Sequence, residues 1–123
     1  MLKYGFFNSV DGDRKYSADD LSSYFVKLIS NGVFPNPSDN LKVVVKSGLT
    51  VTVKAGFAFC NAKYAENTSD YDLTLDNADT TNPRIDRIVL RLNTTNREFT
   101  LAIIKGTPDA EPTAPDITRT STV

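Results

Sequence analysis

The chain has 123 residues, which is enough for one domain with a hydrophobic core and too short for two of ordinary size. Its net charge of −1 and its lack of histidine give no electrostatic case for binding nucleic acid or for inserting into an anionic membrane. A single cysteine, Cys60, excludes an intrachain disulfide framework and a cysteine-based zinc site. The aromatic residues around it predict a buried structural thiol.

The first predicted elements are an aromatic strand over residues 4–10, a turn at residues 11–13 and a helix over residues 18–30. Ser17 can cap the helix, since its hydroxyl can accept the backbone N–H of Asp20. Apolar side chains at spacings of three and four residues form one stripe on this helix: Leu21, Tyr24, Phe25, Leu28 and Ile29. Because the helix is amphipathic, we expect it to pack on a sheet.

Alternating apolar and polar side chains predict short antiparallel strands in the middle of the chain. Ser47 and Gly48 fit a two-residue hairpin turn between two such strands. After a kink at Ala55 and Gly56 the chain becomes extended again, and residues 67–70 form a turn. The strands expected here cover residues 41–46, 49–54, 57–60 with a continuation over 62–66, and 71–75.

Residues 82–92 and 97–105 are the most strand-prone stretches, and the polar loop between them predicts an antiparallel hairpin. Along the first strand, one face carries Ile88, Leu90 and Leu92, and the other face carries two arginines. We expect the apolar face to be core. The helix stripe is predicted to dock on the hairpin's apolar side chains: Ile88, Leu90, Leu92, Leu101 and Ile103.

Residues 106–115 contain three prolines and almost no bulky apolar side chain, so they cannot pair in a central sheet. We interpret them as an extended arm pinned over a surface. Residues 117–123 have strand composition and no terminator, which predicts further protein downstream. The fold class expected for residues 1–123 is a single mainly β domain, an antiparallel sandwich or small open barrel with one packed amphipathic helix.

No catalytic constellation is present in the sequence, because acid–base chemistry lacks its usual histidine. Four aspartates, Asp70, Asp72, Asp76 and Asp79, offer oxygen ligands for calcium. Their spacing differs from that of the twelve-residue calcium loop, and a solvated strand edge explains them better. We therefore predict no enzyme activity, no metal and no cofactor.

Tyrosines and arginines are the candidate site residues. The tyrosines combine a stacking ring with a polar tip, which suits either a protein interface or a sugar-binding platform. The arginines either pair with acidic groups across a sheet or reach a neighbouring subunit. The possible interface residues are Tyr4, Tyr16, Tyr64, Tyr71, Arg84, Arg87 and Arg91.

Three blocks of this sequence resemble the N-terminal domain of tail and baseplate proteins from bacteriophages and prophages of Gram-positive bacteria. The blocks are YGFFNSVDGDRKYSADDL (residues 4–21), PRIDRIVLRL (residues 83–92) and KGTP with PTAPDITR (residues 105–108 and 112–119). The resemblance covers nearly the whole chain. It implies a virion structural protein, made in the bacterial cytoplasm, that attaches a fibre or receptor-binding protein to the phage tail.

The same resemblance implies partners among other tail and baseplate proteins and a homo-oligomer, usually a trimer. It carries over no catalytic residues. The alternative is a carbohydrate-binding module of the same adhesion apparatus, in which exposed tyrosines stack on a host cell-surface saccharide.

Overall fold

The computed structural model describes residues 1–120 and is mainly β, as predicted, with antiparallel strands and one short helix near the N-terminus. The described strands form three small open sheets and no closed barrel. The elements are α1 (Ala18–Phe25), β1 (Gly32–Val33), β2 (Val43–Ser47), β3 (Thr50–Val53), β4 (Gly56–Cys60), β5 (Lys63–Asn67), β6 (Tyr71–Thr74), β7 (Arg87–Asn93) and β8 (Glu98–Ile104).

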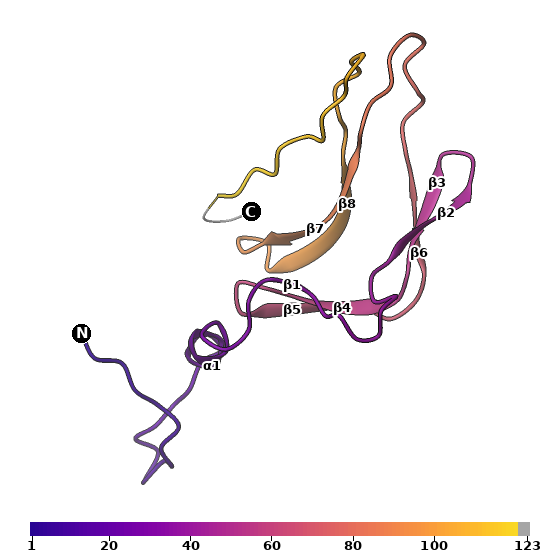
Figure 1. Cartoon of the computed structure of the whole chain (residues 1–123). Helices are drawn as coiled ribbons and strands as arrows, with labels where there is room; N and C mark the ends of the chain where they lie inside the picture. The colour runs from indigo at the N-terminus through magenta and orange to yellow at the C-terminus, as the bar shows by residue number, and fades with distance from the viewer. Residues whose placement is uncertain (121–123) are drawn as a thin grey trace.

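The three sheets surround a common interior that is open on one side (Figure 1). One sheet has the strand order β1-β4-β5, the second has the order β2-β3-β6, and β7 pairs with β8 in the third. The predicted central hairpin is confirmed, with Leu90 opposite Leu101 and Leu92 opposite Phe99. These side chains share the face of the hairpin that points toward the common interior, and Leu92 is buried there.

The turns differ from the sequence prediction at two places. The β2–β3 turn lies at Gly48 and Leu49, one residue later than expected, because an irregularity between Val45 and Ser47 shifts the register. Residues 62–66 do not continue the preceding strand but fold back on it as β5. Asn61 and Ala62 both have positive φ, at 47° and 62°, which makes the tight turn that reverses the chain.

The N-terminal prediction is wrong in three respects. Residues 4–10 form no strand, since Phe6 has a φ of 65° and the Tyr16 hydroxyl takes the backbone N–H of Phe7 at 2.9 Å. The helix ends at Phe25, after which Lys27 and Leu28 donate to carbonyls three residues back. It also projects away from the sheets, so its stripe does not dock on the hairpin of its own chain (Figure 1).

The Ser17 cap is confirmed, with a reciprocal pair of bonds to Asp20. At the other end of the chain, residues 117–120 form no strand, and residues 121–123 of the predicted final strand lie outside the described residues.

A buried asparagine joins the first two sheets. The Asn40 side chain is 8% exposed; its amide donates to the carbonyls of Phe34 at 2.9 Å and Phe57 at 2.8 Å, and its oxygen accepts from the Phe57 N–H. A Cβ at Gly56 would lie 2.1 Å from the same amide oxygen, so this position requires glycine. Asn67 adds a second link by donating to the carbonyl of Lys54 at 3.0 Å.

The PRIDR motif (residues 83–87) fastens the proline-rich arm (residues 106–115) to the third sheet. Asp86 accepts the Gly106 N–H at 2.8 Å and the Arg84 Nε–H at 3.0 Å. Arg87 donates from Nε to the carbonyl of Pro115 at 2.6 Å. The arm therefore lies on its own chain, along the side of the hairpin that carries Arg87 (Figure 1). A Cβ at Gly106 would meet the Ile85 carbonyl oxygen at 2.0 Å, which explains why glycine begins the arm.

Replacing Asn40 by alanine should strongly destabilise the fold. The substitution removes the partner of the Phe34 carbonyl and of the Phe57 N–H, while the Phe57 carbonyl keeps its bond from the Phe34 N–H, and each unsatisfied buried group costs about 1–3 kcal/mol. We expect Asn40→Ala to lower the free energy of unfolding by at least about 2 kcal/mol, measured by urea denaturation. Asn77→Ala is the matched control, because this exposed side chain makes no hydrogen bond within residues 1–120. Equal stability of the two variants would contradict the role of Asn40.

Candidate functional site

The chain exposes more surface than a compact protein of its size. Its accessible area is 9474 Å², whereas a compact monomer of 13.5 kDa should expose about 6,500 Å². Few hydrophobic side chains among the described residues are buried: Val51, Val53, Ala58, Phe59 and Leu92. Most of the other large apolar side chains are wholly or partly accessible. The surface left open lies mainly in two places, an interior cleft and the N-terminal segment.

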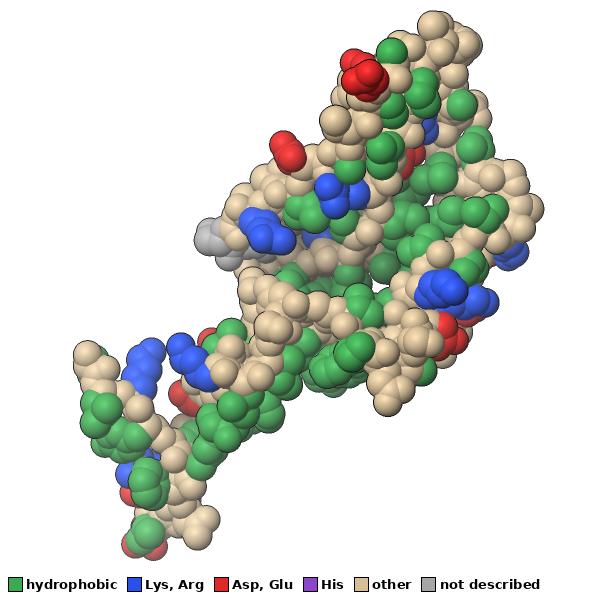
Figure 2. All heavy atoms as spheres, in the orientation of Figure 1, with side chains coloured by type: hydrophobic (Ala, Val, Ile, Leu, Met, Phe, Trp, Pro, Cys, Tyr) green, Lys and Arg blue, Asp and Glu red, His purple; other side chains and the backbone are tan. Residues whose placement is uncertain are grey.

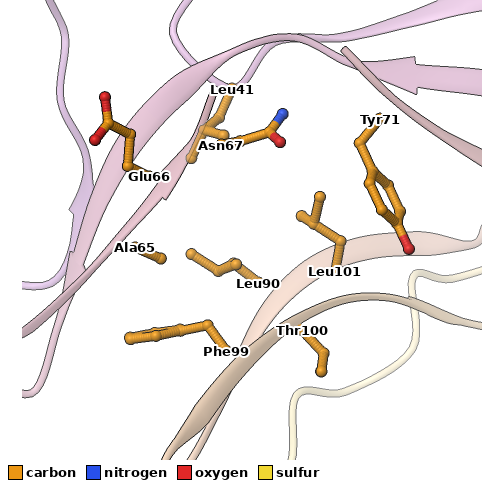
Figure 3. Close-up of a pocket in the computed structure, with 9 residues that line it drawn as sticks. All are labelled: Leu41, Ala65, Glu66, Asn67, Tyr71, Leu90, Phe99, Thr100 and Leu101. Carbon is orange, nitrogen blue, oxygen red and sulfur yellow. The ribbon is translucent and has the colours of Figure 1, made fainter. Parts of the chain in front are cut away.

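The cleft has a volume of about 390 Å³ and opens between β5 and the hairpin. Leu90, Phe99 and Leu101 line it from the hairpin, Ala65 faces them from β5, and Tyr71 closes one end (Figure 3). Figure 2 shows hydrophobic side chains gathered around this hollow. Glu66 and Asn67 add polar groups at its margin. The lining is therefore mostly apolar, and such a surface suits an apolar group of a partner better than a charged ligand.

The second open surface is the N-terminal segment (residues 1–30). It holds itself together locally: Phe6 and Tyr24 pack edge to face at 4.8 Å, and the Arg14 guanidinium lies over the rings of Tyr4 and Phe7. Every hydrogen bond, ion pair and ring contact of residues 1–30 stays within that segment. The segment thus has a structure of its own and no specific polar tie to the sheets.

The apolar stripe of the helix is exposed. Leu21 and Phe25 are both more than two-fifths accessible, and Leu28, just past the end of α1, is 63% exposed. Only Ile29 of the predicted stripe is half-buried. Figure 2 shows the apolar side chains of this region reaching solvent at the lower left of the molecule. An exposed stripe of this kind usually marks a surface that another molecule covers.

The structure separates the tyrosines proposed as site residues. Tyr4 and Tyr16 belong to the N-terminal segment, and the Tyr16 hydroxyl is engaged by Phe7. Tyr71 lies at the cleft. Tyr64 lies on β5, 66% exposed, with its ring stacked on Phe57 at 5.4 Å. They therefore do not form one platform, and only Tyr64 presents a supported ring face to solvent.

The arginines proposed as site residues have different environments. Arg84 has a side chain only 8% exposed, and it donates to Asp86 and to the carbonyls of Asp76 and Asn77 at 2.6 Å. Arg87 is bound to Pro115. These contacts assign both residues to fastening the arm and its preceding loop. Arg91 is exposed on the outer face of β7 and stays a candidate interface residue.

The four aspartates do not converge. Asp70 pairs with Lys54 at 2.6 Å, Asp72 pairs with Lys46, and Asp76 pairs with Lys105 at 3.0 Å, while Asp79 caps the loop at Thr81 and Asn82. Within residues 1–120 no group of three or more His, Cys, Asp or Glu side chains could hold a metal ion. Cys60 is half-buried, more accessible than predicted. No helix in that part of the chain is long and apolar enough to cross a membrane.

Four carboxyl groups in residues 1–120 have a depressed pKa, namely Asp20, whose pKa is lowered by its hydrogen bonds with Ser17, and three in the sheets and loops. A hydrogen bond from Lys46, followed by one from Thr52, lowers the pKa of Asp72. The backbone N–H groups of Asn82 and Thr81 lower that of Asp79.

At the arm, the hydrogen bond from Arg84 is the main cause that lowers the pKa of Asp86, and the Gly106 N–H contributes as well. The two ion pairs of these groups, with Lys46 and Arg84, thus help to hold the second sheet and the arm in place.

Sequence reasoning missed the cleft. The sequence pattern predicts that the strand ending at Cys60 continues over residues 62–66, and such a strand would place Ala65 far from the hairpin. The asparagine at position 61 was the available signal, since this residue adopts positive φ more readily than most. Phe99 was recognised only as part of a strand, although it is the aromatic side chain that the hairpin contributes to the cleft.

Comparison of the chain with models of protein families, with curated proteins and with solved structures gives no match.

Acid should weaken the attachment of the proline-rich arm. The folded-state pKa of Asp86 lies below its ordinary value of 3.8, so its stabilising contribution is complete above about pH 4 and is lost as the pH falls through the folded value. We expect the free energy of unfolding in urea to fall as the pH drops below about 4, and to fall less steeply in Asp86→Asn. Asp86→Asn should also be less stable than wild type at pH 7. An identical pH dependence in both proteins would contradict the assignment.

Proposed function

We propose that this chain is a structural docking domain of a phage tail or baseplate, which attaches a fibre or receptor-binding protein to the virion. The observation that carries the proposal is the open apolar surface of the N-terminal segment and the cleft. A domain that works inside an assembly leaves such surface for its neighbours to cover, whereas soluble monomers rarely expose large contiguous apolar patches. The resemblance of residues 4–21 and 83–92 to tail and baseplate proteins supplies the context.

The location of the described polar groups also supports an assembly role. The buried or paired groups, such as Asn40 and the Arg84–Asp86 pair, are satisfied within the chain and hold sheets and arm in place. No buried side-chain polar atom in residues 1–120 lacks a partner. Reactive sites usually hold polar groups poised toward a pocket, and the cleft lining is mostly aliphatic and aromatic. The chemistry of this surface is that of packing.

A second candidate function is saccharide binding, and Tyr64 is the observation that favours it. Its exposed ring is held nearly parallel to Phe57, at an interplanar angle of 13°. A supported aromatic face of this kind can stack on the apolar face of a sugar ring. Glu66 lies on the same face of β5 two residues further along and offers a hydrogen-bonding carboxylate.

The attachment role predicts that the protein is a component of purified virions. Antibodies raised against residues 1–123 should label phage particles at the distal end of the tail in immuno-electron microscopy, and mass spectrometry should detect the chain in particles purified by density gradient. Particles lacking their tails are the control and should carry no label. Complete absence of the chain from infectious particles would contradict the proposal.

The saccharide alternative predicts a binding defect in Tyr64→Ala. Titration of host cell-wall saccharide into the protein should give measurable binding that falls at least about tenfold in this variant, because the stacking partner is lost. Tyr4→Ala is the matched control, as it removes an equally exposed tyrosine from a different surface. Equal binding by both variants, or none by wild type, would exclude Tyr64 as a saccharide platform.

A further inference from the structure

We propose that the apolar stripe of Leu21, Phe25 and Leu28 docks in the cleft of a second copy of this chain. The helix of one copy would thereby complete the core that the sheets of the next copy leave open. The inference rests on the proposed docking role only in treating these two surfaces as interfaces. It names their occupant from the chain's own geometry.

The N-terminal segment can leave its own chain at little cost. All of its hydrogen bonds and ring contacts are internal, from the Ser17–Asp20 cap to the packing of Phe6 on Tyr24. Its connection to the sheets begins at Asn31, whose side chain exchanges hydrogen bonds with Asn61 at 2.8 and 3.1 Å. Moving residues 1–30 onto another copy therefore breaks no polar contact, and this is the condition under which exchange of an element between chains is favourable.

The tether keeps Leu28 away from the far end of the cleft in its own chain. Leu28 lies three residues before Asn31, so it reaches at most about 10 Å from the point where Asn31 is fixed to Asn61. The cleft margin at Glu66 and Asn67 is at the far end of β5, and that strand alone is about 13 Å long. Leu28 cannot cover this end of the cleft unless the contact between Asn31 and Asn61 breaks.

The two surfaces match in chemistry and in size. From Leu21 to Leu28 the stripe is about 10 Å long. The apolar face of β8 from Phe99 through Leu101 to Ile103 is about 13 Å long. Both are mostly apolar. A helix stripe laid on a sheet face is a common way for these elements to bury apolar surface.

The exposed area is enough for such an assembly. The chain exposes about 3,000 Å² more than a compact monomer of its mass, while a standard interface takes about 800 Å² from each partner. Because the helix and the cleft are different surfaces, each copy would give one helix and receive another. This head-to-tail arrangement closes into a ring when the rotation between copies allows it.

The first test compares Leu28→Ser with Lys27→Ser by sedimentation equilibrium of the purified chain at micromolar to submillimolar concentration. Leu28→Ser should raise the dissociation constant of the assembly at least about tenfold, because a side chain that becomes buried on association is lost. Lys27→Ser removes a neighbouring long side chain that is charged and not part of the apolar stripe, and it should leave the constant within about twofold. Urea midpoints of the monomers should agree, since Leu28 is 63% exposed in the single chain.

A wild-type chain that stays monomeric over this range would overturn the inference, as would equal effects of the two substitutions. Both outcomes concern purified protein, so they leave the test for the chain in virions untouched.

The second test identifies the receiving surface by disulfide formation in a Cys60→Ala background. A Leu28→Cys chain mixed with a Tyr71→Cys chain should form a mixed disulfide dimer under mild oxidation, because Tyr71 lines the cleft (Figure 3), whereas Leu28→Cys with Lys46→Cys should not, because Lys46 is on β2 away from the cleft. Dimers linked through Leu28→Cys on both chains would show helices packed on one another and would overturn the inference. So would a monomeric disulfide in the double variant Leu28→Cys/Tyr71→Cys.

Discussion

Asn40 satisfies three backbone groups at the point where the chain leaves one sheet and enters the next. A peptide group buried without a partner costs about as much as several well-made hydrogen bonds contribute, so these contacts fix where β4 lies relative to the start of β2. The positions of Gly56 and β5 depend on where these contacts place β4. Gly56 can approach only because it lacks a Cβ, and β5 is then carried to the position where Ala65 faces the hairpin.

A second set of polar contacts places the hairpin and its arm. Arg84 spans from Asp86 to the carbonyls of the preceding loop, and Asp86 reaches across to the first residue of the arm. The PRIDR motif (residues 83–87) therefore connects three segments through its hydrogen bonds: the preceding loop, β7 and the arm. The close approach of Gly106 to Ile85 and the short hydrogen bonds to Asp86 and Arg87 leave little freedom for the arm. By contrast, no comparable contact fastens residues 1–30, and the helix is left with its apolar stripe in solvent.

Local patterns predicted the elements better than they predicted their arrangement. Alternation over residues 87–93 and 98–104 predicted the hairpin and its inward face without any tertiary information. The three-residue spacing from Ser17 to Asp20 predicted the helix cap in the same way. The chain reversal at Asn61 and Ala62 was not predicted, because no glycine marks it in the sequence. The strand predicted at residues 4–10 does not form, because Phe6 adopts positive φ. The helix is amphipathic as predicted, but its stripe does not dock on its own hairpin, because a stripe carries no information about which surface it meets. The cleft depends on contacts between distant segments, which periodicity cannot specify.

The central claim is that the core of one chain is completed by the helix of another. Amide hydrogen exchange, measured at concentrations below and above the midpoint of assembly, tests it most directly. If the claim holds, the protection of residues 21–29 and of the hairpin residues around Phe99 and Leu101 is greater at the higher concentration, and the two regions gain it together. Protection of residues 21–29 that is already complete in the monomer, or that is absent in the assembly, would contradict it.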